Sequence, residues 1–362
     1  MKKIICFFIL AVFGLSCERP EVGYLSDDIH SLQDSMFVPR GIFMHSSIPA
    51  VEGSTYPLEW KITSITDKDG KPTTELQEEH EILLWKSPFD PRTDTTLELA
   101  MKKLELKKKP AILMNPVSGQ FTFTQATKNV VNDHFIVNVS AKNVRGERQL
   151  EKFTNIKMTP FKAVEFPTTT RCITQFINQT TGATTIALDY RIENEFDTKV
   201  PNVMNGTDKY FSIKKVINEP ALGIKVKMIT TDSKNNAISP SKVIFFVNGG
   251  AVLANFHDNT ITPEVSADGT TFGLPAPPFP QYSRTYTGTN AYLMYYLTTN
   301  DAYSFDRAAY EAEKGVKPDS FYAPFKDANG NIVVRGYIRW GIKINDTGTY
   351  ELTMRHPYTI KK

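Results

Sequence analysis

Cysteine is rare in this chain of 362 residues, and an excess of either charge is absent. Three cysteines cannot build the dense disulfide framework of a small secreted domain. The 42 lysines and arginines nearly balance the 39 aspartates and glutamates, so electrostatics give no reason to expect a nucleic-acid partner. Long apolar runs are also scarce, because the strongest internal candidate, 243–247, is cut by Asn248-Gly249-Gly250. A polytopic membrane protein is therefore excluded.

The sequence lacks the local motifs of common catalytic sites. It contains no G-x-S-x-G elbow, phosphate-binding loop, H-E-x-x-H or C-x-x-C. Its six histidines are scattered, and no two have the spacing of metal ligands. We therefore expect no enzyme, no cofactor and no metal site. A surface glycoside hydrolase stays open as an alternative, because its two carboxylates can lie anywhere in the sequence.

The N-terminus has the pattern of a secretory leader. Lys2 and Lys3 precede an uncharged stretch, 4–15, whose length of about 18 Å as a helix is too short to cross a bilayer of roughly 30 Å. We expect residues 1–16 to be a signal peptide. The residues Gly14-Leu15-Ser16-Cys17 resemble a bacterial lipobox, which implies that Cys17 carries lipid and anchors the protein in the outer membrane. Cys172 would then be the single free thiol of the mature chain.

Composition and periodicity divide the rest of the chain into three parts. Residues 17–40 have few periodic apolar positions and are expected to form a flexible tether after the lipidated cysteine. Alternation of period two dominates from residue 41 onward, and Pro160 and Pro167 mark a seam. We expect one β domain over 41–160 and a second over 161–362.

Both expected domains carry motifs of a known sandwich. The turn Asn115–Gly119 has the form N-P-x-S-G, an F-x-F strand follows, and a later alternating strand ends as A-x-N-x-x-G at Gly146. These residues resemble a recurring bacterial immunoglobulin-like module. The run from Asp346 to Tyr350 resembles the D-x-G-x-Y tyrosine corner of immunoglobulin-like sandwiches. The resemblance implies an all-β fold of tandem immunoglobulin-like β-sandwich domains.

Two segments interrupt the β pattern. The spacing of Leu97, Met101 and Leu104 predicts a helix over 95–109 that ends at Pro110. A second helix is expected over 303–315, with Asp306 as its N-terminal cap and Gly315 at its end. The latter would be a short helical insertion in the second domain.

Aromatic residues are concentrated near that insertion. Twelve lie between Phe279 and Phe325, and eight of the fifteen tyrosines are among them. An exposed tyrosine offers a flat apolar face together with a hydroxyl group, which suits stacking on a sugar ring or gripping a peptide. Tyrosines of a strand-like run at 292–296 are expected in the core. The candidate ligand-binding residues are Tyr282, Tyr286, Tyr303, Tyr310, Tyr322 and, near a turn, Trp85.

The lipobox, the tether and the tandem β domains together resemble a known group of proteins. They are similar to the SusE-like accessory lipoproteins encoded beside SusC/SusD-type nutrient importers of Bacteroidetes. The resemblance implies a cell-surface protein that captures a glycan, or less favourably a peptide, and passes it to a TonB-dependent transporter.

A structural role is the remaining alternative. Type V pilins of the same bacteria are also lipoproteins with two β-sandwiches. Pro39-Arg40-Gly41 could then be a protease site that releases a strand for polymerisation.

Overall fold

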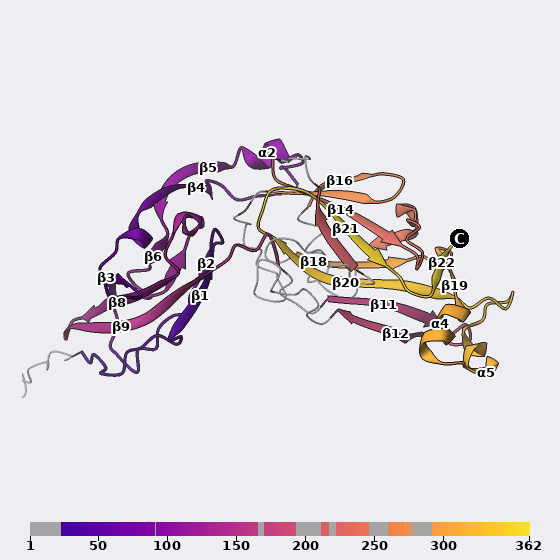
Figure 1. The fold of residues 1–362 in the computed structure, drawn as a ribbon, viewed down its shortest axis with the longest axis horizontal. Helices are drawn as coiled ribbons and strands as arrows, with labels where there is room; N and C mark the ends of the chain where they lie inside the picture. Colours follow the sequence, from indigo (N-terminus) through magenta and orange to yellow (C-terminus); the bar gives the residue numbers. More distant parts are fainter. Residues whose placement is uncertain are drawn as a thin grey trace, which may run out of the picture. The chain divides into compact units, whose positions relative to one another are not determined.

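The computed structural model describes residues 23–90, 92–165, 170–192, 211–216, 222–245, 260–275, 277 and 292–362. These residues form mostly β-strands in several sheets with a few short helices, which confirms the all-β class (Figure 1). The chain divides into two compact units. Unit 1 comprises described residues of Met1–His80 and Lys109–Thr159, and unit 2 those of Glu81–Lys108 and Pro160–Lys362. The segment 81–108 therefore belongs to unit 2, although unit 1 surrounds it in sequence.

Unit 1 is a sandwich of a four-stranded and a three-stranded sheet. Rings from the two sheets meet inside, where Phe121 lies edge-on to Phe153 with their centroids 6.3 Å apart. The ring centroid of Trp60, in the same sheet as Phe153, lies 6.0 Å from that of Phe153. The first sheet has the order β1 (Ser35–Pro39), β9 (Gly146–Thr159), β8 (His134–Asn143), β3 (Glu59–Asp67). The second has the order β2 (Met44–His45), β7 (Phe121–Phe123), β6 (Ile112–Met114), and unit 1 also holds the short 3₁₀ turns η1 (Glu75–Gln77) and η2 (Gln125–Asn129).

The predicted strands and turn of unit 1 are confirmed. The apolar positions predicted on one face of β8 are buried from Phe135 to Ala141. In the N-P-x-S-G turn, the Oδ1 atom of Asn115 accepts hydrogen bonds from the amides of Val117 and Ser118. Gly119 ends this turn with φ of +71°, and a Cβ atom there would lie 2.7 Å from the ring of Trp60. Glycine is therefore required both by the backbone and by the close approach of the indole.

The predicted tether is wrong over its last residues, because 35–39 form strand β1. This strand pairs in parallel with β9, and it buries Met36 and Val38 in the core of unit 1. Only two apolar positions alternate, and Asp34 and Ser35 precede them, so the strand left a weak pattern in the sequence.

The helix predicted over 95–109 is shorter than expected. Helix α2 (Leu97–Met101) begins at the cap Thr96, whose side chain accepts a hydrogen bond from the amide of Leu99. The chain then turns into strand β5 (Leu104–Pro110), which pairs with β4 (Glu79–Trp85). Leu104 fits the helical spacing, but in the structure it is the first residue of β5. It is buried there, whereas Leu106 is exposed.

Unit 2 contains two larger sheets. The six-stranded sheet has the order β12 (Thr184–Ile192), β11 (Thr170–Ile177), β20 (Val334–Ile344), β18 (Tyr292–Thr298), β15 (Val243–Phe245), and β10 (Val164–Glu165) pairs with β20. The five-stranded sheet has the order β13 (Phe211–Lys215), β21 (Gly348–Arg355), β14 (Ile224–Thr231), β17 (Thr270–Leu274), β16 (Ile261–Val265). Smaller elements are the pair β19 (Tyr303–Phe305) and β22 (Thr359–Lys361) and the 3₁₀ turn η3 (Pro240–Lys242).

Buried side chains hold the two larger sheets of unit 2 together. His356, directly after β21, is fully buried, and its ring lies over Gly336 of β20. A Cβ atom at Gly336 would lie 2.6 Å from the imidazole, so the close approach of these elements depends on glycine.

The tyrosine corner and the second helix are also observed. The hydroxyl group of Tyr350 donates a hydrogen bond to the carbonyl oxygen of Asp346 at 3.3 Å, as the D-x-G-x-Y motif predicts. Burial raises the pKa of the Tyr350 hydroxyl above its ordinary value. Helix α4 (Arg307–Lys314) is capped by Asp306, whose Oδ1 atom accepts from the amide of Ala309. It is followed by α5 (Asp319–Tyr322) and η4 (Ala323–Phe325), whereas 303–305, expected in the helix, form strand β19.

Candidate functional site

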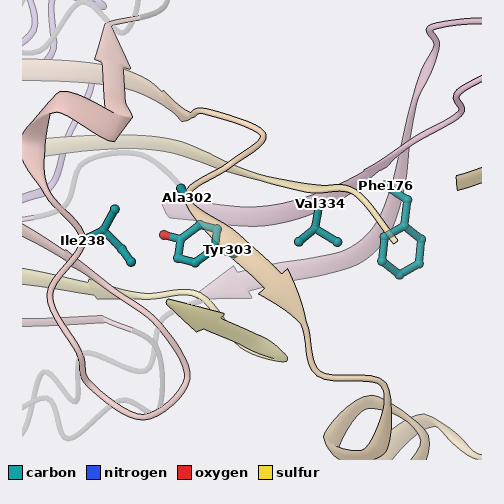
Figure 2. Close-up of a cluster of buried hydrophobic side chains, with 5 residues drawn as sticks. All are labelled: Phe176, Ile238, Ala302, Tyr303 and Val334. Carbon is teal, nitrogen blue, oxygen red and sulfur yellow. The ribbon is translucent and has the colours of Figure 1, made fainter. Parts of the chain in front are cut away.

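Three of the tyrosines predicted to bind ligand are buried. Tyr303, Tyr310 and Tyr322 have exposed fractions of 0%, 5% and 0%. Figure 2 shows the Tyr303 ring between Ile238 and Val334 in an apolar cluster of unit 2. The expectation that these three rings face the medium is therefore wrong.

The reason lies in the packing around helix α4. Tyr310 and Tyr322 form a cluster with Tyr358, and the Tyr322 hydroxyl group donates a hydrogen bond to Glu311 at 3.1 Å. The guanidinium group of Arg307 lies 4.5 Å from the centroid of the Tyr322 ring. Burial raises the pKa of Tyr322 to about 12, and the hydrogen bond to Glu311 adds to this rise. These tyrosines therefore hold the helical insertion on the β scaffold.

Trp85 is partly buried. Its ring lies 6.1 Å from that of Phe89, and it packs on a small core made by Phe89, Leu97, Ala100 and Ile261. It thus supports the end of the β4–β5 hairpin in unit 2. The other three predicted site residues, Cys17, Tyr282 and Tyr286, lie outside the described residues.

An exposed pair of tyrosines lies instead at one end of unit 1. Tyr24 has an exposed fraction of 55% and Tyr56 one of 60%. Among the tyrosines whose burial the structure describes, these are the two that are exposed, and the hydrogen bonds around them hold their backbones together. We call Tyr24 and Tyr56 the tyrosine pair.

Asn143 connects the two segments of this site by hydrogen bonds. It ends strand β8, is buried, and donates from Nδ2 to the carbonyl oxygens of Tyr24 at 2.9 Å and Thr55 at 3.0 Å. The amide of Thr55 donates to the carbonyl oxygen of Tyr24 at 2.8 Å, and the amide of Tyr24 donates to the Thr55 hydroxyl group at 2.9 Å. The segments that carry the two rings are therefore fixed to each other and to the turn that follows β8.

The charges around the tyrosine pair are largely matched. Arg148 pairs with Asp27, and Lys142 lies 3.9 Å from Glu59. Val144, on the turn after Asn143, is an exposed apolar neighbour against which Gly23 packs. The site thus offers two ring faces, two hydroxyl groups and an apolar side chain.

We expect Asn143→Ala to lower the free energy of unfolding of unit 1 by about 1–3 kcal/mol. The substitution removes a donor to two carbonyl oxygens that lie at a largely buried position. Urea denaturation of the wild-type and variant chains measures the change. Lys142→Ala, at an exposed position of the same strand, is the control, and an equal loss there would contradict the special role of Asn143.

Sequence reasoning missed the tyrosine pair because its two members looked unrelated. Tyr24 was assigned to the tether, and Tyr56 stands beside Pro57 in a loop without periodicity. The available signal was Asn143 in the A-x-N-x-x-G motif, since a buried amide at a strand end must find partners.

Arg40, the residue of the suggested protease site, takes part in the fold of unit 1. Its side chain is 20% exposed, pairs with Asp133 at 2.6 Å, and donates to the carbonyl oxygens of Val131 and Asn132. A trypsin-like protease would have to break these contacts to bind the guanidinium group.

Metal-binding clusters and membrane-spanning helices are both absent from the residues that the structure describes. Within them, no three His, Cys, Asp or Glu side chains come together as a metal site. The same residues contain no helix with the length and apolar character needed to span a membrane.

Comparisons with known proteins assign no family. No family model and no curated protein matches the sequence. A solved SusE-like surface-located polysaccharide-binding protein from the heparin utilisation locus of Bacteroides thetaiotaomicron is similar at 10% identity with a TM-score of 0.24, over 91% of this chain and 53% of that chain. The N-terminal four immunoglobulin domains of Dscam1 isoform 4.44 are similar at 10% identity with a TM-score of 0.19, over 91% of this chain and 74% of that one. This chain thus spans about half the length of the SusE-like protein.

Proposed function

We propose that this protein is a cell-surface lipoprotein that binds polysaccharide through the tyrosine pair. The observation that carries the proposal is that Tyr24 and Tyr56 are both exposed while Asn143 joins the backbone of Tyr24 to that of Thr55, the residue before Tyr56. Ordering the site before the ligand arrives lowers the entropic cost of binding. We therefore expect two exposed rings on segments that are fixed to each other to bind a ligand more tightly than two rings on mobile segments would.

The chemistry of the site favours a glycan over a peptide. A sugar ring has an apolar face that stacks on tyrosine and hydroxyl groups that match the phenolic oxygens. Two of the nearby basic side chains, Arg148 and Lys142, are already matched within the protein by Asp27 and Glu59. The ligand class that fits best is thus a neutral stretch of polysaccharide.

The proposed location and role of the protein in the cell rest on its sequence. We propose that residues 1–16 are removed, that lipid on Cys17 holds the protein at the outer membrane, and that two β-sandwich domains follow. In this role the protein binds glycan without catalysis and delivers it to a TonB-dependent SusC/SusD-type importer. Tyr282 and Tyr286 remain proposed ligand contacts.

We expect Tyr24→Ala and Tyr56→Ala each to weaken binding of a neutral polysaccharide by about 1–3 kcal/mol, because each removes a stacking face. Affinity electrophoresis of the full chain against a panel of neutral polysaccharides identifies a ligand, and calorimetry measures the variants.

Two controls separate stacking from general effects. Tyr56→Phe keeps the ring and should retain most of the affinity. Val131→Ala changes another exposed apolar residue of unit 1 and should have no effect. If both alanine variants bind as tightly as the wild type, the tyrosine pair is not the site.

A further inference from the structure

A third exposed aromatic residue, apart from the tyrosine pair, lies on the outer face of the four-stranded sheet of unit 1. Phe37 of β1 has an exposed fraction of 63%, whereas its neighbours Met36 and Val38 are buried on the other face. Phe37 pairs in register with Lys157 of β9, and Lys157 pairs with His134 of β8. Directly paired residues project to the same side of a sheet, so these three side chains form a row.

A second row, with three polar side chains and one isoleucine, runs beside the first. Ser35, Asn155, Ile136 and Thr66 are paired across the same four strands. The Nδ2 atom of Asn155 donates to the carbonyl oxygen of Asp34 at 2.9 Å, and its Oδ1 atom lies 3.4 Å from Nε2 of His134. The face therefore combines a fixed amide and hydroxyl groups with one exposed ring.

The charge of this face is positive. Lys157 is exposed, and its Nζ atom lies 5.7 Å from the centroid of the Phe37 ring. No carboxylate among the described residues pairs with Lys157, and neither row contains an acid. Of the two acids that precede the rows, Asp133 is paired with Arg40, and Asp34 lies exposed at the residue before Ser35. The ammonium group is thus available to an anion.

We infer that this face binds an anionic polysaccharide. Phe37 stacks on the apolar face of a sugar ring, Lys157 pairs with the carboxylate or sulfate group of that sugar, and Asn155 and His134 bond to its hydroxyl groups. The inference rests on the proposed polysaccharide-binding function, but it uses residues other than the tyrosine pair.

The two faces lie on the same unit and share strand β9. The strand begins at Gly146, beside the turn that holds the tyrosine pair, and reaches Lys157 after eleven residues, about 35 Å along an extended strand. A long polymer with neutral and charged stretches would contact both and gain avidity.

The test compares two polymers with the same sugars and different charge. Polygalacturonate should bind the full chain, and its fully methyl-esterified form should bind at least about tenfold more weakly. Dextran sulfate, which carries sulfate groups and no carboxylate, distinguishes the two kinds of anion. Phe37→Ala and Lys157→Gln should each weaken the binding of an anionic polymer about tenfold, and Lys157→Arg should restore it.

Lys61→Gln is the matched control, since Lys61 is exposed on β3 of the same sheet but pairs with Ser140, far along β8 from His134. Equal weakening by Lys61→Gln and Lys157→Gln would overturn the inference in favour of diffuse attraction. Equal binding of polygalacturonate and its ester would overturn it as well. A chain that binds neutral polysaccharide through the tyrosine pair, but neither anionic polymer, overturns this inference and leaves the proposed function standing. Anionic binding that survives in Tyr24→Ala supports the inference independently.

Discussion

Tyr322→Ala is expected to lower the free energy of unfolding of unit 2 by about 4 kcal/mol. The ring is fully buried against Tyr310 and Tyr358, and its loss leaves a cavity beneath helix α4. The substitution also removes the hydrogen bond to Glu311 and the ring under Arg307, both of which hold α4 to α5. Urea denaturation followed by circular dichroism measures the change.

Tyr322→Phe is the matched variant, since it keeps the ring and removes only the hydroxyl group. It should cost about 1 kcal/mol, the contribution of one hydrogen bond to a charged acceptor at a partly screened site. A Tyr322→Ala chain that keeps its stability and loses glycan affinity would contradict the structural role and return Tyr322 to the list of ligand contacts.

The second large effect concerns pH and His356. Burial lowers the pKa of His356 from 6.5 to about 4, so the folded protein holds this imidazole neutral. The unfolded chain binds a proton at pH values below 6.5, where the folded chain does not, so stability falls as the pH drops from about 6.5 to about 4. The expected loss from this group is about 3 kcal/mol at pH 4, from about 1.36 kcal/mol per unit of pKa. Urea denaturation at intervals between pH 7 and pH 4 measures it.

His356→Phe isolates this contribution, because it keeps a ring over Gly336 but has no proton to gain. Its stability should change about 3 kcal/mol less between pH 7 and pH 4 than that of the wild type. Carboxylates with a lowered pKa, such as Asp232 and Glu311, begin to lose their contribution as the pH approaches their ordinary values of 3.8 and 4.5, but they do so in both chains and therefore cancel in the comparison. Equal pH dependence of both chains would show that His356 is not the responsible group.

Local motifs predicted the fold well where each residue satisfies a backbone requirement. Asp346 and Tyr350 form the predicted corner, Asp306 caps the predicted helix, and Asn115 closes the predicted turn. In each case the partner lies within four residues, so the sequence carries the whole interaction. Strand β1 was missed because its partner β9 lies more than a hundred residues away.

The candidate site was harder to predict because aromatic density does not report burial. Tyr303, Tyr310 and Tyr322 are clustered in sequence, and they pack on one another and on Phe305 and Phe176 inside unit 2. Tyr24 and Tyr56 are distant in sequence, and their segments are joined by hydrogen bonds between Tyr24 and Thr55 and from Asn143 to both. Which tyrosine is exposed is decided by tertiary packing, and no local pattern encodes it.

The apolar core around Trp85 has a consequence for biosynthesis. Phe89, Leu97 and Ala100 leave the ribosome long before Ile261, the residue of β16 that covers them. During synthesis these side chains stay uncovered until most of the chain has been made. A chaperone that shields segment 81–108 in that interval would protect the nascent protein from aggregation.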